Sequence, residues 1–154
     1  MDWPPPSRRM STTRREQNLA LLGALASGAV IAVALVLLLD QIPRNVFRNS
    51  GHAFATDPLA LHVASRAIDA GHDAKIDAGL RFFFYLPFEH SEAIADQDRA
   101  VELFTALGNA DLLGYANAHR DVIVRFGRFP HRNRALGRSN SPEEQAWLDA
   151  GGGF

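Results

Sequence analysis

The stretch that decides the fold is LVLLLDQIPRNVFR, Leu35–Arg48, in which an apolar run passes directly into a polar segment. The run begins upstream, because Leu19–Leu39 contains no charged residue over 21 positions. We predict a helix over 19–39 that ends at Ile42-Pro43, since proline disfavours α geometry at the residue before it. Residues 1–18, rich in Pro, Ser, Thr and Arg, are predicted to form a disordered tail.

Three interpretations of Leu19–Leu39 are open. Its length is enough to cross a bilayer and four Arg precede it, which is typical of a single-pass membrane anchor. Ala32-Val33-Ala34 has the small-residue pattern of a signal-peptide cleavage site. A fully buried core helix is the third interpretation, favoured by the direct passage into Asp40 without a linker. In that case the second half of the run should pack against Phe83, Phe84, Val122 or Phe126.

Apolar spacing and capping residues predict further helices downstream. The candidate N-caps are Asp57, Ser91, Asn109 and Ser141, the last with Glu144 as its capping-box partner. The predicted helices are Pro58–Ala70, Leu80–Leu86, Glu92–Leu107, Ala110–Phe126 and Pro142–Asp149. No stretch of useful length shows the alternation of apolar and polar residues that is typical of strands. The fold class is therefore all-α, an antiparallel arrangement of five to six helices in which 40–154 form one domain.

Composition excludes several classes of protein. The chain has 154 residues, 47% of them hydrophobic, and a net charge of −1. It contains no cysteine, which excludes disulfide scaffolds, iron–sulfur sites and thiol nucleophiles. Acidic residues dominate 52–118, whereas 119–138 contain six Arg. Such segments are expected to pair with each other, so nucleic acid is an unlikely partner.

Two proline-containing segments resemble each other. DQIPRN at 40–45 and RFPHRN at 128–133 each follow a predicted helix and carry an apolar residue, Pro and then Arg-Asn. Asp40 would face the negative end of its helix dipole and so needs a nearby cation, with Arg44, Arg128 and Arg132 as candidates. We predict that both segments meet the acidic turn 89–92 at one end of the bundle, as buried or half-buried ion pairs.

The turn Glu89-His90-Ser91-Glu92 is the densest acid and histidine group. Its spacing matches no zinc signature, so no metal site is predicted. A set of ion pairs that only fixes loops is one interpretation of the polar cluster, and a ligand site is the other. Its members are Asp40, Gln41, Arg44, Asn45, Glu89, His90, Glu92, His119, Arg128, His131, Arg132 and Asn133.

Five ordered segments resemble a known family. They are LVLLLDQIPRNVFR (35–48), HAFATDPLAL (52–61), FFFYLPFEHSE (82–92), HRDVIVRFGRFPHRN (119–133) and LGRSNSPEEQAWL (136–148). Together they resemble the bacterial family catalogued as domain of unknown function 924. The resemblance implies a tetratricopeptide-like all-α fold and a cytoplasmic protein, with no established activity. Met1–Asn18 lacks the Trp/Phe-rich helical segment expected there, so the chain is expected to be an N-terminally truncated or atypical member.

The leading functional hypothesis is a non-catalytic binding or scaffold module for a small anionic ligand or a protein segment. It assigns no catalytic residue, cofactor or metal. An alternative is an enzyme in which Glu89, Glu92, His90 or His119 acts as acid and base, while Arg128 and Arg132 hold an anionic substrate. A further alternative is a membrane-anchored domain, with Leu19–Leu39 as the anchor.

Overall fold

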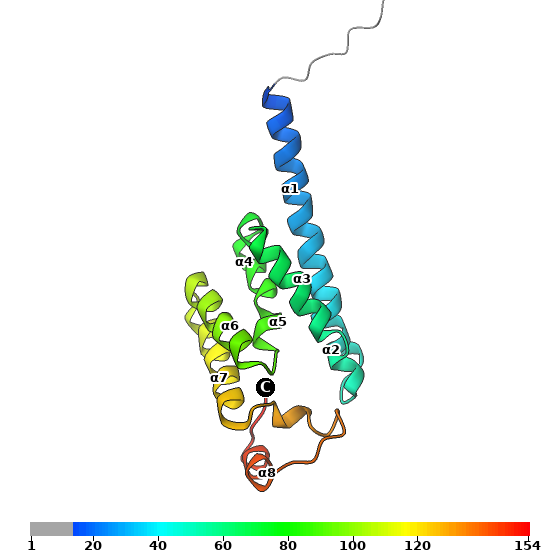
Figure 1. Ribbon diagram of the computed structural model, residues 1–154, viewed down its shortest axis with the longest axis vertical. Helices are drawn as coiled ribbons and strands as arrows, with labels where there is room; N and C mark the ends of the chain where they lie inside the picture. The colour runs from blue at the N-terminus through cyan, green and yellow to red at the C-terminus, as the bar shows by residue number, and fades with distance from the viewer. Residues whose placement is uncertain (1–13) are drawn as a thin grey trace, which may run out of the picture.

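The structure, a computed structural model, describes residues 14–154, and every regular element in this range is helical (Figure 1). The all-α fold class, an arrangement of packed helices, is therefore confirmed. The α-helices are α1 (Arg14–Val36), α2 (Ile42–Val46), α3 (Asp57–Asp69), α4 (Ala78–Arg81), α5 (Leu86–Glu89), α6 (Ile94–Leu107), α7 (Ala110–Phe126) and α8 (Pro142–Asp149). Residues 14–18 belong to α1, so the predicted tail was wrong there, and its remainder, 1–13, lies outside the described residues.

The boundaries of the longer helices follow their capping residues. The Asn109 side chain accepts a hydrogen bond from Leu112 N at 3.0 Å, and Ser141 forms the predicted capping box with Glu144. Two predicted N-caps were wrong, because α3 is preceded by Thr56 and α6 by Ala93. The predicted helix 80–86 is broken into α4, a 3₁₀ turn at 82–84 and α5, in which Pro87 occupies the first turn.

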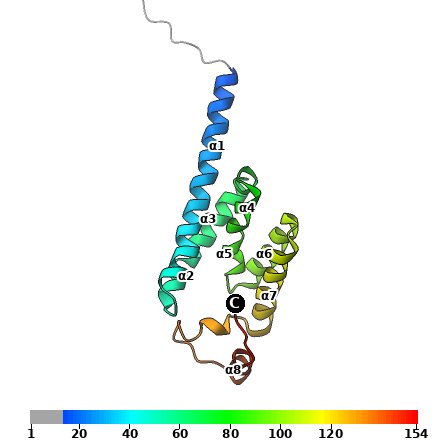
Figure 2. The same ribbon diagram turned by 180° about the vertical axis from the view of Figure 1, so that it is seen from behind.

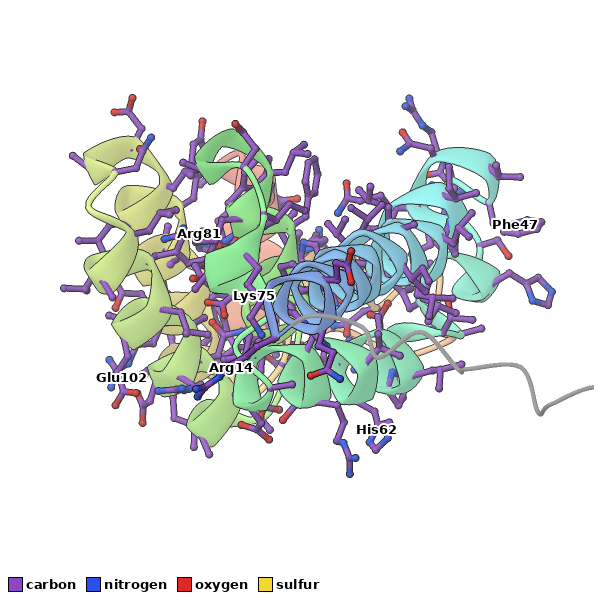
Figure 3. The ribbon with its side chains drawn as sticks, turned by 90° about the horizontal axis from the view of Figure 1, so that it is seen from above. Arg14, Phe47, His62, Lys75, Arg81 and Glu102 are labelled. Atoms are coloured by element: carbon purple, nitrogen blue, oxygen red, sulfur yellow. The ribbon has the colours of Figure 1, made fainter. Side chains whose placement is uncertain are left out.

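The helices form two pairs with short segments between them. Helix α1 packs against α3, and α6 packs antiparallel to α7. Viewed along α1 in Figure 3, α6 and α7 lie at one edge, α4 and α5 in the middle, and α1 and α2 at the other edge. The main core contains Val33, Val36, Ala64, Ala67, Phe84, Tyr85, Phe88, Ala100, Leu103, Phe104 and Ala116. Phe83 packs on this cluster as well, whereas Val122 and Phe126 belong to a second cluster with Phe129 and Trp147.

Only one face of α1 is buried. Ala29, Val33, Val36 and Asp40 are spaced as one helical stripe, and each is at most 6% exposed. The second half of the run packs on the main core through Val33 and Val36, as expected for a core helix, whereas its other face exposes Val30, Ile31, Leu35 and Leu38. The N-terminal half of α1 extends beyond the other helices (Figure 2). By length and composition alone, Gly28–Val46 is long and apolar enough to cross a membrane, and 28% of it is buried.

The helix does not end at Ile42-Pro43, as the sequence had predicted, but continues to Val46 through a widened turn at Leu37–Gln41. Pro43 has no N–H to donate to the carbonyl four residues earlier, that of Leu39. The Thr56 hydroxyl donates to this carbonyl instead, at 2.5 Å, while Ile42 N–H bonds to Leu37 O. The turn is thus a π-helical bulge stabilised by a residue from the start of α3. Asp40 lies within it, 1% exposed.

We expect Thr56→Val to lower the free energy of unfolding by about 1–2 kcal/mol, because the Leu39 carbonyl would lose its hydrogen-bond donor. Thr56→Ser retains the hydroxyl and should lose less than half as much. Urea denaturation of both variants beside the unmodified protein measures the difference. Equal losses for valine and serine would show that the hydroxyl does not stabilise the widened turn.

Candidate functional site

A cavity of about 460 Å³ opens at the lower end of the bundle in Figure 1, where α2, α5, α7 and the turn Pro130–Arg132 come together. This volume is typical of small-molecule sites. Its lining includes Arg44 from α2, Phe54, Glu89 of α5 and His90, His119 from α7, and Arg132. The two proline-containing segments and the acidic turn therefore do lie at one end of the fold.

Asp40 is a buried carboxylate that contacts two residues of the cavity lining, His90 and Arg44. It accepts hydrogen bonds from His90 Nδ1 at 2.7 Å and Gln41 Nε2 at 2.5 Å, and lies 3.0 Å from Arg44 Nη1. Burial alone would raise the pKa of Asp40, but the hydrogen bond from His90, the charge of Arg44 and the Gln41 amide together lower it. Asp40 is therefore ionised at neutral pH and fixes both neighbouring side chains.

Arg44 connects Asp40 to a second acid, Asp57. Its Nη1 and Nη2 donate to the two Asp57 carboxylate oxygens at 2.8 and 2.9 Å, and Nη1 also donates to Asp40 O at 2.8 Å. This bidentate pair is the geometry that a guanidinium favours. Asp57 was interpreted as a helix cap from its place before Pro58, and its role here was missed because its partner lies 13 positions away.

His90 is oriented by its contact with Asp40. Because the Asp40 carboxylate is ionised and only accepts, Nδ1 of His90 carries the hydrogen and Nε2 keeps a lone pair. Burial lowers the pKa of His90, and this effect outweighs the neighbouring Asp40 charge. The result is a neutral imidazole of fixed tautomer, beside the cavity.

Glu89 and His119 approach at 3.3 Å but do not form an ion pair near neutral pH. Burial, with a smaller contribution from Asp40, raises the pKa of Glu89 to about 7. Burial lowers the pKa of His119 to about 4. The Tyr115 carbonyl, 2.9 Å from Nδ1 of His119, requires the hydrogen on that nitrogen. Between about pH 4 and 7 both side chains are thus mostly neutral.

Arg132 is a buried cation between two aromatic rings. Its Cζ lies 4.8 Å from the Phe54 ring centroid and 4.3 Å from that of Phe129, and its side chain is 6% exposed. Nη1 donates to His90 O at 2.9 Å and lies 3.6 Å from the Asp57 carboxylate. Nε is buried without a hydrogen-bond partner. Burial lowers the pKa of Arg132 to about 10, so it remains charged at neutral pH.

Three predicted site residues belong to a separate polar network outside the cavity. Arg128 forms a bidentate pair with Glu144 at 2.6 and 2.7 Å, and Glu92 forms one with Arg138 at 2.7 and 2.9 Å. Asn133 accepts from Arg138 Nε at 2.8 Å and lies 3.4 Å from Glu144. These bonds hold the segment after α7 against α8, so for this part the loop-fixing interpretation applies.

The predicted polar cluster therefore divides into three groups. Asp40, Gln41, Arg44, Glu89, His90, His119, His131 and Arg132 line the cavity or support its walls. Glu92, Arg128 and Asn133 belong to the network beside α8, and Asn45 is exposed, donating to Gln41 O. Phe54 and Arg48 were missed, because short turns give no periodic signal. Within residues 14–154, no group of three or more potential ligands is placed to hold a metal ion.

We expect Asp40→Asn to lower the free energy of unfolding by about 2–4 kcal/mol, since His90 and Arg44 would lose their shared charged acceptor. Burial shields the interaction from salt, so the loss should persist in high salt. Asp98→Asn is the control, because its pair with Arg120 is exposed, and should cost less than about 1 kcal/mol. Urea denaturation at low and high salt makes the comparison. Equal losses for the two variants would contradict the buried role of Asp40.

Glu89→Gln should stabilise the protein at alkaline pH. The folded state retains the Glu89 proton up to about pH 7, whereas the unfolded state releases it near its ordinary pKa of 4.5. Stability is therefore lost as the pH rises between these values, and glutamine, which cannot ionise, removes this loss. We expect a gain of about 1–3 kcal/mol at pH 8 that largely disappears at pH 5.

Urea denaturation at both pH values measures this effect, with Glu102→Gln as a surface control on α6. Glu102→Gln should change the free energy of unfolding little, and by the same amount at both pH values. A Glu89→Gln effect that is the same at pH 5 and pH 8 would show that Glu89 titrates normally.

Residues 7–152 match a family described as a bacterial protein of unknown function, DUF924. The match includes α1 and so extends further toward the N-terminus than the five segments quoted above. The solved structure of a protein of unknown function from Agrobacterium tumefaciens is similar, with 48% identity and a TM-score of 0.78, covering 87% of this chain and 76% of that one. No curated protein matches the chain. From the extent of the family match, the chain belongs to the bacterial DUF924 family.

Proposed function

We propose that the chain is a binding protein for a small anion, which enters the cavity and contacts Arg132. The observation that carries the proposal is a pair of buried, unpartnered nitrogens on adjacent residues, Nε of Arg132 and Nδ1 of His131. Leaving buried polar atoms unpaired costs free energy, so such atoms are typical of places where a ligand completes the hydrogen bonding. Both residues line the same cavity.

The charges around the cavity support an anion. Arg44 holds Asp57 in a bidentate pair, so Arg132 has only a 3.6 Å contact with that carboxylate. Arg48 adds a further cation to the cavity lining, and its side chain donates to Asn45 Oδ1 at 3.2 Å. Glu89 is largely protonated below neutral pH and contributes little opposing charge there. The positive charge is thus in slight excess, which suits a ligand carrying one or two negative charges.

The Arg132 guanidinium is prepared for this role by its surroundings. Phe54 and Phe129 hold its plane between them, and the His90 carbonyl fixes Nη1. A planar cation with a fixed orientation loses little conformational entropy when it binds a carboxylate or phosphate. Recognition of a protein segment through one of its carboxylates would use the same cation.

Isothermal titration calorimetry with inorganic phosphate and with acetate tests the proposal directly. We expect at least one of these anions to bind the unmodified protein, and Arg132→Gln to weaken it by about tenfold or more. Arg120→Gln, at an exposed pair on α7, is the matched control and should stay within about twofold. Arg48→Gln provides a second variant at an exposed position, so that a folding defect in Arg132→Gln cannot hide the result. Absence of binding by both anions at about 10 mM would refute the proposal.

A second candidate, an acid–base enzyme, is favoured by one specific arrangement. Asp40 holds His90 as a neutral base with a lone pair on Nε2, and Glu89, beside it in sequence, keeps its proton to about pH 7. Two neighbouring groups with different protonation tendencies are what acid–base catalysis requires. Release of nitrophenolate from p-nitrophenyl acetate or phosphate, abolished by His90→Gln, would support this candidate over simple binding.

A further inference from the structure

The C-terminal segment of the chain returns to the cavity. Helix α8 ends at Asp149, and the chain then turns back so that the C-terminus lies above α8, below α5 and beside the lower end of α7 (Figure 1). The Phe154 ring stacks on the His119 imidazole, with centroids 3.6 Å apart and planes at 13°. It also forms T-shaped ring pairs with Phe129 and His131, with centroids 6.2 and 5.7 Å apart. These three residues form a ring seat on the cavity wall, and Phe154 occupies it.

The ring seat lies directly beside the cation of the proposed anion site. Phe129 is the shared element, because its ring packs against Arg132 at 4.3 Å and against His119 at 5.7 Å. His119 and Arg132 also line one cavity together. The cavity therefore combines two kinds of recognition, a flat aromatic surface and a guanidinium with an unpartnered N–H.

The Phe154 side chain is only partly covered by the protein. The side chain is 55% exposed, and the contacts described above are ring contacts. The approach of the segment depends on glycine, because a Cβ on Gly152 would lie 2.3 Å from the Trp147 ring. Gly153, with φ of +140°, then adopts a conformation that other residues rarely take. A ligand that makes the same stacking contact would compete with Phe154 for this position.

We propose that the cavity recognises an aromatic acid, a planar ring carrying a carboxylate on a short link, whose ring replaces Phe154 on His119 while its carboxylate meets Arg132. Phe154 is then an internal competitor that occupies the ring seat until the ligand arrives. This proposal rests on the anion-binding function proposed above and adds the chemical class of the ligand. The neutral state of His119 suits the contact, because stacking requires no charged group to lose its water.

Calorimetric titration of the full chain with phenylacetate and with acetate tests this inference. The two probes share the carboxylate and differ by the ring. The unmodified protein should bind phenylacetate more tightly than acetate, by about threefold or more. Phe154→Ala should tighten phenylacetate binding by a further factor of about three to ten, because the competitor is removed, and should leave acetate binding within about twofold.

Two further variants separate this effect from a general one. Gly152→Ala retains the Phe154 ring but disturbs its approach, so it should tighten phenylacetate binding in the same direction. Phe47→Ala removes a half-exposed ring at the end of α2, which projects away from the helices in Figure 3, and should change neither affinity. Thermal unfolding of each variant establishes that the fold is retained.

The outcomes distinguish the two proposals. If acetate binds in an Arg132-dependent way but phenylacetate is no tighter, the anion site stands and the aromatic-acid inference is overturned. If Phe154→Ala weakens phenylacetate binding, the ring is part of the ligand site and not a competitor, which also overturns the inference. If neither acetate nor phenylacetate binds, and phosphate also fails, both proposals are refuted.

Discussion

The arrangement of the polar site depends on one buried charge, the carboxylate of Asp40. A carboxylate with almost no exposure to water is tolerated only where donors surround it. His90, Arg44 and Gln41 supply them, and each is thereby fixed in position. Arg44 then fixes Asp57, which approaches Arg132. A single acid within a helical bulge thus orders both the imidazole and the cations around the cavity.

The bulge itself follows from a proline and a hydroxyl. Pro43 would normally end or kink a helix, because it leaves the carbonyl four residues earlier without a donor. Thr56 supplies that donor and, in doing so, gives up the capping of its own helix. The widened turn allows α1 to continue through the proline with Asp40 on the buried stripe of the helix. A local departure from ideal helical geometry is therefore what brings the charge inside the protein.

The sequence predicted those features whose hydrogen bonds are local. Asn109 and Ser141 cap their own helices within three residues, and both were identified correctly. The sequence did not predict the features whose hydrogen-bond partners come from distant positions in the chain. Asp57 pairs with Arg44, and Glu92 accepts from Phe129 N and from Arg138, which lies 46 positions away. The bulge was missed for the same reason, since its donor is 17 residues beyond the carbonyl that it satisfies.

The position of Asp40 on the buried stripe also fixes the rotation of α1 about its own axis. A shift of one residue along an α-helix turns a side chain by about 100°, which would carry Asp40 away from His90. The helix therefore has one permitted register, and its exposed apolar row, including Ile31, Leu35 and Leu38, has one fixed direction. That row lies on the face of α1 turned away from the buried stripe. Whatever meets it approaches from outside the bundle, and can do so while the cavity is occupied.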